Sequence, residues 1–292
     1  MTYKELYAQI KKKQSFLCVG LDSDFAKIPA CVKEKFGADR AQYEFNKAIV
    51  KATAKYAVAY KLNTAFYESE GAQGFEQMAL TVKYIKKYYP EVFVIADAKR
   101  GDIGNTAEQY AKAFFEKMNF DAVTISPYMG EDAVSPFLKY KGKWAIILAL
   151  TSNKSASDFE TLSVCCKNGK KEEGFNRGGD CACMPVYESV ILESLKWGNK
   201  ENVMFVVGAT HPDEISRIRT IAPDSFFLVP GVGAQGGTVS DVAIHGMNEF
   251  CGLLVNSSRG IIFAGEEKNF AAAAAENARE LALEMLPFIR KI

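Results

Sequence analysis

Eight short apolar segments that alternate with segments of helical character are the feature that most constrains the fold of this chain. β-Branched and aromatic residues are common in these segments, which favours buried strands, and most are followed by apolar residues at helical spacing. Strands that alternate with helices in this way form parallel βαβ units. The eight expected strands are residues 16–21, 57–60, 92–96, 121–125, 144–150, 203–207, 226–229 and 252–255.

Eight βαβ repeats predict a single (β/α)8 TIM barrel over residues 1–292, because eight parallel strands close into a barrel and this length suits one such domain. No Pro-, Gly- or Ser-rich linker divides the chain near its middle. An open doubly wound sheet is the alternative, but the turn Gly20–Ser23 after the first strand lacks the glycine-rich fingerprint of that fold. The polar residues 153–185 are expected to form an insertion that carries four cysteines.

Polar side chains follow five of the expected strands at the end where TIM barrels place their active sites. One polar strand end is weak evidence, since it could be a structural ion pair, but a convergent set on one rim indicates a site. These residues are Asp22, Lys61, Asp97 with Lys99, Ser152 and Arg259.

The stretch Asp97–Thr106 at the end of the third strand carries the densest charge. Asp97 and Lys99 are two residues apart in a strand, so their side chains should point to the same side. Asp102 should lie on a short turn, after which Asn105 is expected to cap a helix, with Glu108 closing a capping box. Burying such charges without partners is unfavourable, which favours a structural or functional role for all of them.

Glycine-rich residues after the seventh strand and an arginine after the eighth predict a phosphate site, since TIM barrels often bind phosphate at these two loops. The run Pro230–Gly237 contains four glycines, which let backbone N–H groups approach an anion. Arg259 would add charge-assisted donors. A flexible loop beside a salt-bridged arginine is the simpler alternative. The glycines could also serve as hinges of a lid.

Composition argues against several classes of partner and location. The 36 basic and 35 acidic residues nearly cancel, so no overall field favours nucleic acid or a membrane surface. No apolar stretch is long enough for a membrane span, and the lysine-rich residues 1–15 do not resemble a secretion signal. We therefore expect a cytoplasmic protein.

Seven cysteines and two histidines offer little for a metal site. An odd cysteine count in a chain without a secretion signal argues against a disulfide framework. Cysteines 165, 166, 181 and 183 lack the Cys-x-x-Cys spacing of structural zinc sites, so free thiols in a surface insertion are expected. His211 and His245 are both expected in loops.

The motif Asp-x-Lys-x-x-Asp-Ile-x-x-Thr, which begins at Asp97, closely resembles that of the orotidine 5′-phosphate decarboxylase family. So do Lys61 after the second strand, Pro-Gly-Val-Gly-x-Gln after the seventh and the arginine after the eighth. The runs 61–68 and 207–210 resemble the longer, type 2 branch of that family. The resemblance covers essentially the whole chain. Ser258, however, stands where a glycine often precedes the phosphate arginine.

This resemblance implies a (β/α)8 homodimer that converts orotidine 5′-monophosphate to uridine 5′-monophosphate and carbon dioxide, the last step of de novo UMP synthesis, without cofactor or metal. It implies that Lys99 donates a proton to pyrimidine C6, that Asp97 lies near the substrate carboxylate, and that Lys61 holds Asp97 and a ribose hydroxyl. Asp102, Ile103 and Thr106 would serve the neighbouring subunit's site.

The remaining implied contacts are with the substrate. Asp22 would bind the ribose, Ser152 the edge of the pyrimidine, and Gln235 and Arg259 the phosphate. Asn63 and Pro230 complete the implied set.

The chemistry of the residues agrees with the function that the resemblance implies. An alternating array of Lys61, Asp97, Lys99 and Asp102 would keep Lys99 protonated, and a fixed ammonium can stabilise a carbanion and then protonate it. A magnesium-dependent sugar-phosphate lyase of the hexulose-phosphate synthase kind is one alternative. A Schiff-base aldolase is disfavoured, because its lysine must be neutral. A nucleotide-binding protein without catalysis is disfavoured, because binding needs no such charged cluster.

Overall fold

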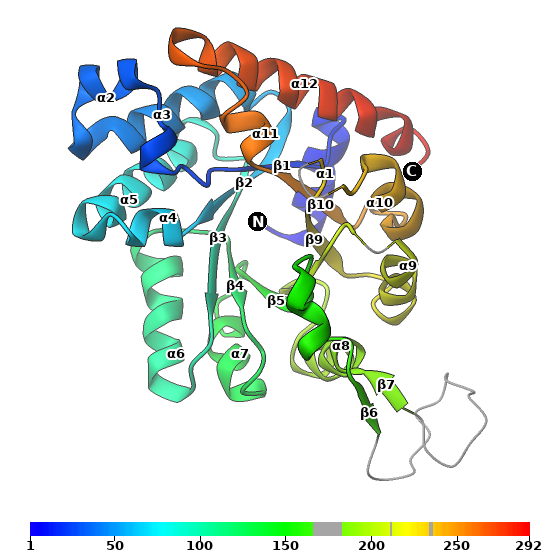
Figure 1. The fold of residues 1–292 in the computed structure, drawn as a ribbon. Helices are drawn as coiled ribbons and strands as arrows, with labels where there is room; N and C mark the ends of the chain where they lie inside the picture. Colours follow the sequence, from blue (N-terminus) through cyan, green and yellow to red (C-terminus); the bar gives the residue numbers. More distant parts are fainter. Residues whose placement is uncertain (166–182, 211, 234–235) are drawn as a thin grey trace.

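A computed structural model of the chain describes residues 1–165, 183–210, 212–233 and 236–292. Within these residues, eight parallel strands close into a barrel in the order β1-β10-β9-β8-β5-β4-β3-β2, and the expected TIM barrel is confirmed (Figure 1). The barrel strands are β1 (Leu17–Gly20), β2 (Ala57–Asn63), β3 (Phe93–Arg100), β4 (Ala122–Ile125), β5 (Trp144–Leu150), β8 (Val203–Val207), β9 (Phe226–Pro230) and β10 (Leu253–Ser257).

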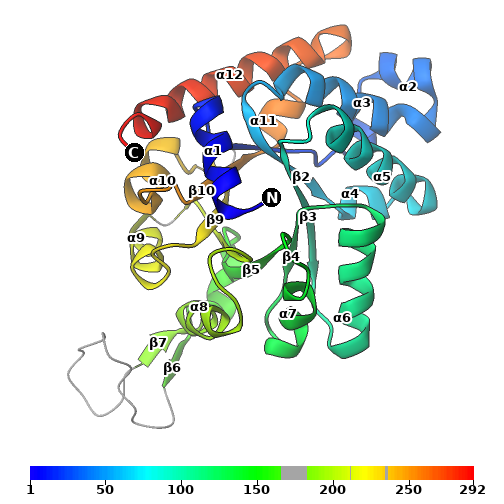
Figure 2. The ribbon, with the colours of Figure 1, turned by 180° about the vertical axis from the view of Figure 1, so that it is seen from behind.

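Helices surround the barrel on its outer side, as both ribbon views show (Figures 1 and 2). The last helix lies across the top of both views against α3. The α-helices are α1 (Tyr3–Lys13), α2 (Ala30–Phe36), α3 (Ala38–Thr53), α4 (Ala65–Glu68), α5 (Gly71–Tyr88), α6 (Gly104–Ala111), α7 (Glu131–Leu138), α8 (Val186–Trp197), α9 (Pro212–Ile221), α10 (Val239–Gly246), α11 (Arg259–Ile262) and α12 (Phe270–Ile289). The short helical turns are η1 (Phe25–Lys27), η2 (Lys112–Lys117), η3 (Lys154–Asp158) and η4 (Glu267–Asn269).

Helix α1 packs against the N-terminal ends of the strands. Its buried Tyr3 makes edge-to-face contact with Phe226 at the start of β9, and Phe226 in turn contacts Trp144 at the start of β5. The Trp144 indole also donates a hydrogen bond to the backbone carbonyl of Met1. These aromatic contacts pack the N-terminal end of the barrel, opposite the end where the sequence predicted the site.

Two features at helix N-termini differ from expectation. Helix α1 was not predicted, although Thr2 and Glu5 form a capping box at its N-terminus, a pattern that indicates the start of a helix. The predicted box at Asn105 and Glu108 is wrong: α6 begins at Gly104, with Ile103 as its N-cap and no side-chain cap. Glu108 instead accepts a hydrogen bond from Lys139, the C-cap residue of α7, at 2.7 Å. Its side chain is therefore engaged in a tertiary ion pair and does not form the predicted box.

The expected insertion after β5 projects from the barrel as a two-stranded antiparallel hairpin, β6 (Ser163–Cys165) and β7 (Cys183–Pro185) (Figure 1). The prediction of free thiols there is wrong for Cys165 and Cys183, which form a disulfide. The two residues lie directly opposite each other in the hairpin, with Cα atoms 4.3 Å apart. The number of cysteines in the sequence does not predict this pairing. Cys166 and Cys181 lie outside the described residues.

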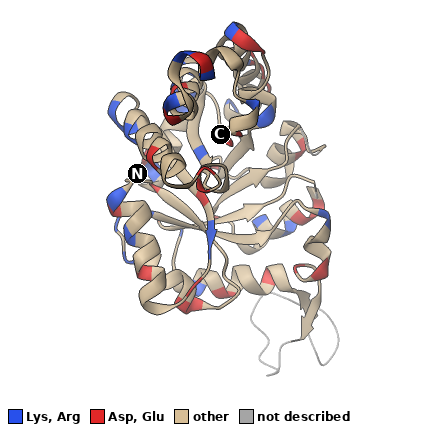
Figure 3. Ribbon diagram, turned by 60° about the vertical axis from the view of Figure 1, so that its left-hand side comes forward, with Lys and Arg blue, Asp and Glu red and all other residues tan. Residues whose placement is uncertain are grey.

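Charged residues of both signs are interspersed around the fold (Figure 3), in keeping with the near-zero net charge. Free cysteines occupy other places: Cys18 and Cys251 are buried, and Cys31 is half-buried. Across the described ranges, no helix combines the length and the apolar character that crossing a membrane requires.

Candidate active site

A cavity of about 480 Å³ opens at the C-terminal ends of the barrel strands. Eight of the predicted site residues line it: Asp22, Lys61, Asn63, Asp97, Lys99, Ser152, Pro230 and Arg259. Its other lining residues are Leu148, Thr151, Asn153, Glu160, Val206, Leu228, Gly231, Val232, Asn256 and Ser258; of these, the sequence had drawn attention only to Gly231, Val232 and Ser258. The cavity therefore joins a charged side to an apolar wall, as small-molecule sites commonly do.

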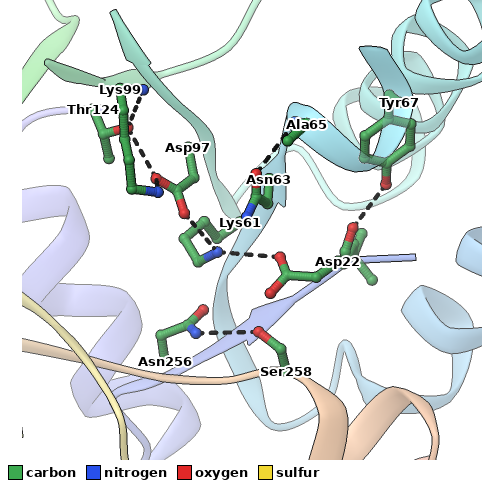
Figure 4. A network of polar contacts seen from close by, with 11 residues as sticks. Asp22, Lys61, Asn63, Ala65, Tyr67, Asp97, Lys99, Thr124, Asn256 and Ser258 are labelled. Atoms are coloured by element: carbon green, nitrogen blue, oxygen red, sulfur yellow. Dashed lines mark hydrogen bonds and ion pairs between the residues drawn. The ribbon is translucent and has the colours of Figure 1, made fainter. Parts of the chain in front are cut away.

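Lys61 lies at the centre of a row of alternating charges (Figure 4). Its ammonium is 3.2 Å from an oxygen of Asp22 and 3.0 Å from Oδ2 of Asp97. The other oxygen of Asp97, Oδ1, is 2.6 Å from the ammonium of Lys99. Three members of the expected array, Lys61, Asp97 and Lys99, are thus in contact in this single chain. Asp22 extends the row at its Lys61 end, and Asp102 is not part of it.

Burial and neighbouring charge act in opposite directions on this row. Burial alone would lower the pKa of Lys61, but the carboxylates of Asp22 and Asp97 outweigh it and raise that pKa. Burial alone would raise the pKa of Asp97, but the ammonium groups of Lys61 and then Lys99 lower it well below its usual range. Lys61 and Asp97 are therefore both charged at neutral pH.

Lys99 differs from Lys61 in the exposure of its side chain, and its backbone has an unusual conformation. Its side chain is 51% exposed, whereas that of Lys61 is 5% exposed, so Lys99 is the cation of the row that a ligand can reach. Its φ of 46° is in the left-handed region, which costs a non-glycine residue on the order of 1–3 kcal/mol. The backbone N–H of Lys99 donates to Thr124 Oγ1 on β4, 2.9 Å away.

A buried network behind β1 holds the segment that carries Asp22. Tyr67 on α4 (Figure 4) donates its hydroxyl to the carbonyl of Leu21, at 2.9 Å. The same hydroxyl accepts a hydrogen bond from Asn46. Asn46 also accepts the hydroxyl of Ser23. Because Leu21 and Ser23 flank Asp22, these bonds fix the backbone on both sides of that carboxylate.

The end of β5 is held by Glu160, which comes from the base of the insertion. The Glu160 carboxylate accepts from the backbone N–H of Thr151 at 2.7 Å and from the Thr151 hydroxyl at 2.8 Å. Ser152, the next residue, lines the cavity. The insertion thus contributes a carboxylate that fixes one wall of the site.

Residues that follow β9 and β10 form the side of the cavity where phosphate binding was predicted. Gly231 has a φ of 101°, a conformation that disfavours any residue with a Cβ, and lines the cavity beside Pro230. Arg259 begins α11, is exposed, and has no carboxylate partner within the described part of the chain. Ser258 lies against Gly20, where an added Cβ would meet the serine Oγ at 1.9 Å. The predicted phosphate ligand Gln235 lies outside the described residues.

Asp102, Ile103 and Thr106 do not line the cavity of their own chain. The Asp102 carboxylate accepts the N–H of Ile103, and the Ile103 side chain is 51% exposed. The expectation that His245 lies in a loop is wrong, because it lies in the last turn of α10 and its Nδ1 is 2.8 Å from Ser216 Oγ. His211 lies outside the described residues.

A closed (β/α)8 barrel with alternating carboxylates and lysines at its strand ends, and with a glycine-rich turn and an arginine at the same cavity, is typical of barrel enzymes that act on phosphorylated compounds. The chain belongs to the orotidine 5′-phosphate decarboxylase / HUMPS family, whose family model matches residues 15–275. The resemblance expected from its motifs is confirmed.

Relatives of full length support this assignment. The orotidine 5′-phosphate decarboxylase of Bacteroides fragilis is 49% identical over 292 residues, which is 100% of both chains. That of Flavobacterium johnsoniae is 50% identical over 99% of this chain and 98% of its own. Among solved structures, Leishmania donovani OMP decarboxylase has a TM-score of 0.79 at 34% identity, covering 99% of this chain and 100% of that chain.

Proposed function

We propose that this chain decarboxylates orotidine 5′-monophosphate to uridine 5′-monophosphate and carbon dioxide, the last step of de novo UMP synthesis. The observation that carries the proposal is the row Asp22–Lys61–Asp97–Lys99, which ends in an exposed ammonium at the cavity. The full-length relatives that bear the decarboxylase name support the choice of reaction.

The decarboxylation step requires one fixed positive charge. When the bond between C6 and the carboxylate carbon breaks, carbon dioxide leaves and the electron pair stays on C6. The ammonium of Lys99 stabilises that pair and then donates a proton to it, which leaves a neutral amine that solvent reprotonates. Because Asp97 holds Lys99 at 2.6 Å and is itself held by Lys61, the ammonium is in place before the charge develops.

Substrate binding is assigned to the remaining lining residues. Asp22 and Asn63 are proposed to bind the ribose, and Ser152 the pyrimidine edge. Arg259, with Pro230 and the predicted ligand Gln235, is proposed to bind the phosphate, since an exposed guanidinium without a carboxylate partner is suited to a phosphate group.

A homodimer with shared active sites accounts for the residues of the motif that the single chain leaves outside its own cavity. Asp102, Ile103 and Thr106 are proposed to complete the cavity of a second copy. Apolar side chains exposed after β3 and β4 support an interface there: Ile103 is 51%, Tyr128 91% and Met129 45% exposed. The cytoplasmic location stays a prediction.

The test is to follow the loss of absorbance as orotidine 5′-monophosphate is converted, with EDTA present throughout, and to identify the product as uridine 5′-monophosphate. Turnover under these conditions would support the reaction and its independence of added metal. No turnover by folded protein would refute the proposal.

A magnesium-dependent lyase acting on a sugar phosphate remains the second candidate, since the matched family model includes the HUMPS branch. The charged row argues against it, because the ammonium of Lys61 already lies between the two carboxylates that such an ion would need. Activity on a sugar phosphate that magnesium restores after EDTA treatment would favour it.

A further inference from the structure

The hydroxyl of Thr124 joins the backbone of Lys99 to the side chain of Asp97. Thr124 Oγ1 accepts the backbone N–H of Lys99 at 2.9 Å and donates its own hydrogen to Asp97 Oδ1 at 3.0 Å (Figure 4). One hydroxyl can do both, since it has one donor and two acceptor lone pairs. The same Asp97 oxygen receives the ammonium of Lys99.

An irregularity in the strand pairing explains why this side chain is needed. Ala96 of β3 pairs with Val123 of β4, and the next pair is Arg100 with Ile125. Three residues of β3, namely Asp97, Ala98 and Lys99, therefore lie opposite the single residue Thr124, which makes a bulge in β3.

The bulge turns Lys99 into the left-handed region and removes the regular ladder partner of its N–H. A partly buried N–H without a partner is unfavourable, and the Thr124 hydroxyl takes the place of the missing carbonyl. Thr124 is fully buried and does not line the cavity, so it reaches a substrate only through Asp97 and Lys99.

We infer that Thr124 is a positioning residue for the decarboxylation, fixing the β3 bulge so that the Lys99 ammonium and the Asp97 carboxylate meet the substrate in one arrangement. The inference rests on the proposed function. It requires the hydroxyl and not merely a β-branched side chain, because both contacts are made by Oγ1.

Thr124→Val keeps the shape of the side chain and removes the hydroxyl. Since a small misplacement of a catalytic group can cost about 10²-fold in rate, we expect kcat to fall roughly 10- to 100-fold, with KM within about threefold of wild type. Binding of uridine 5′-monophosphate, measured by titration calorimetry, should change little, because the cavity lining is intact. Thr124→Ser, which restores Oγ, should recover kcat to within about threefold of wild type.

Thr53→Val is the matched control, because it also removes a fully buried threonine hydroxyl, one that contacts Ile49 and Tyr60 far from the cavity. It should lower the melting temperature and leave kcat unchanged. Should Thr124→Val fail to fold, Thr124→Ala removes the same hydroxyl without placing a methyl group against Asp97.

Each outcome decides a different point. A wild-type kcat in Thr124→Val overturns the positioning role, and so does a loss of product binding that parallels the loss of rate. Failure of folded Thr124→Ser to recover activity shows that shape, not the hydroxyl, matters. An inactive wild-type enzyme would instead refute the proposed function itself, and the positioning role with it.

Discussion

Replacement of Lys61 by methionine tests whether the charged row is held together by its central ammonium. Methionine keeps much of the apolar stem of lysine but leaves Asp22 and Asp97 facing each other without a cation between them. The side chains of Lys61, Asp97 and Asp22 are only 5%, 11% and 18% exposed, so water can compensate for little of the lost attraction.

The expected loss is large for a single substitution. Removing one partner of a buried ion pair typically costs 3–5 kcal/mol, because it leaves an uncompensated buried charge, and we expect a loss of about that size in the free energy of unfolding at pH 7. Urea denaturation followed by the fluorescence of the buried Trp144 measures it. The exposed pair Lys139–Glu108 gives the control: Lys139→Met should cost less than about 1 kcal/mol.

The pH dependence distinguishes lost charge pairing from lost packing. In the wild type the folded-state pKa of Asp97 is depressed, so its contribution to stability is present above the unfolded value, near 3.8, and is lost as pH falls toward the folded value. In Lys61→Met that pKa moves upward, and a proton can relieve the buried carboxylate at milder pH. The stability difference between wild type and variant should therefore be largest near neutral pH and shrink below about pH 5.

Two results would refute this reasoning. A loss below about 1 kcal/mol at pH 7 would mean that the row behaves like a surface pair. A larger loss that stays constant from neutral pH down to about pH 4 would assign the effect to packing rather than to charge.

Two further predictions concern binding and assembly. Arg259→Ala should raise KM for the phosphorylated substrate roughly 10- to 100-fold, as expected for one lost charge-assisted contact, while kcat/KM for the unphosphorylated nucleoside should stay unchanged; an unaltered KM would contradict the phosphate assignment. Inactive Lys99→Ala and Asp102→Ala subunits, mixed in equal amounts under proven subunit exchange, should recover about a quarter of wild-type activity, because half of the dimers are hybrids and one of the two sites in each is intact. No recovery would count against shared sites.

The barrel was predictable because its strands are local patterns. The segments 144–150 and 203–207 were expected at the bounds at which β5 and β8 occur, since an apolar run flanked by polar residues marks a buried strand wherever it lies. The fold then placed Asp22, Lys61, Asp97 and Lys99 at one cavity, because the C-terminal ends of parallel strands share one rim.

What the sequence did not reveal depends on contacts between distant segments. Thr124 and Glu160 are ordinary polar residues in the chain and acquire their roles only when the β3 bulge and the end of β5 bring a donor to each. The Cys165–Cys183 pair needs the register of a hairpin whose strands are three residues each. Glu108 could have capped the backbone at Asn105, but it forms an ion pair with Lys139 at the C-terminal end of α7 instead.

In the proposed reaction, the ammonium of Lys99 supplies both the stabilisation and the proton for decarboxylation. The most direct measurement is kcat for orotidine 5′-monophosphate in Lys99→Ala, together with its melting temperature and its affinity for uridine 5′-monophosphate. Because the variant loses both an electrostatic stabiliser and a general acid, kcat should fall by more than ~10⁴-fold while the protein stays folded and still binds the product. Retention of most of the wild-type activity would contradict the assignment of Lys99.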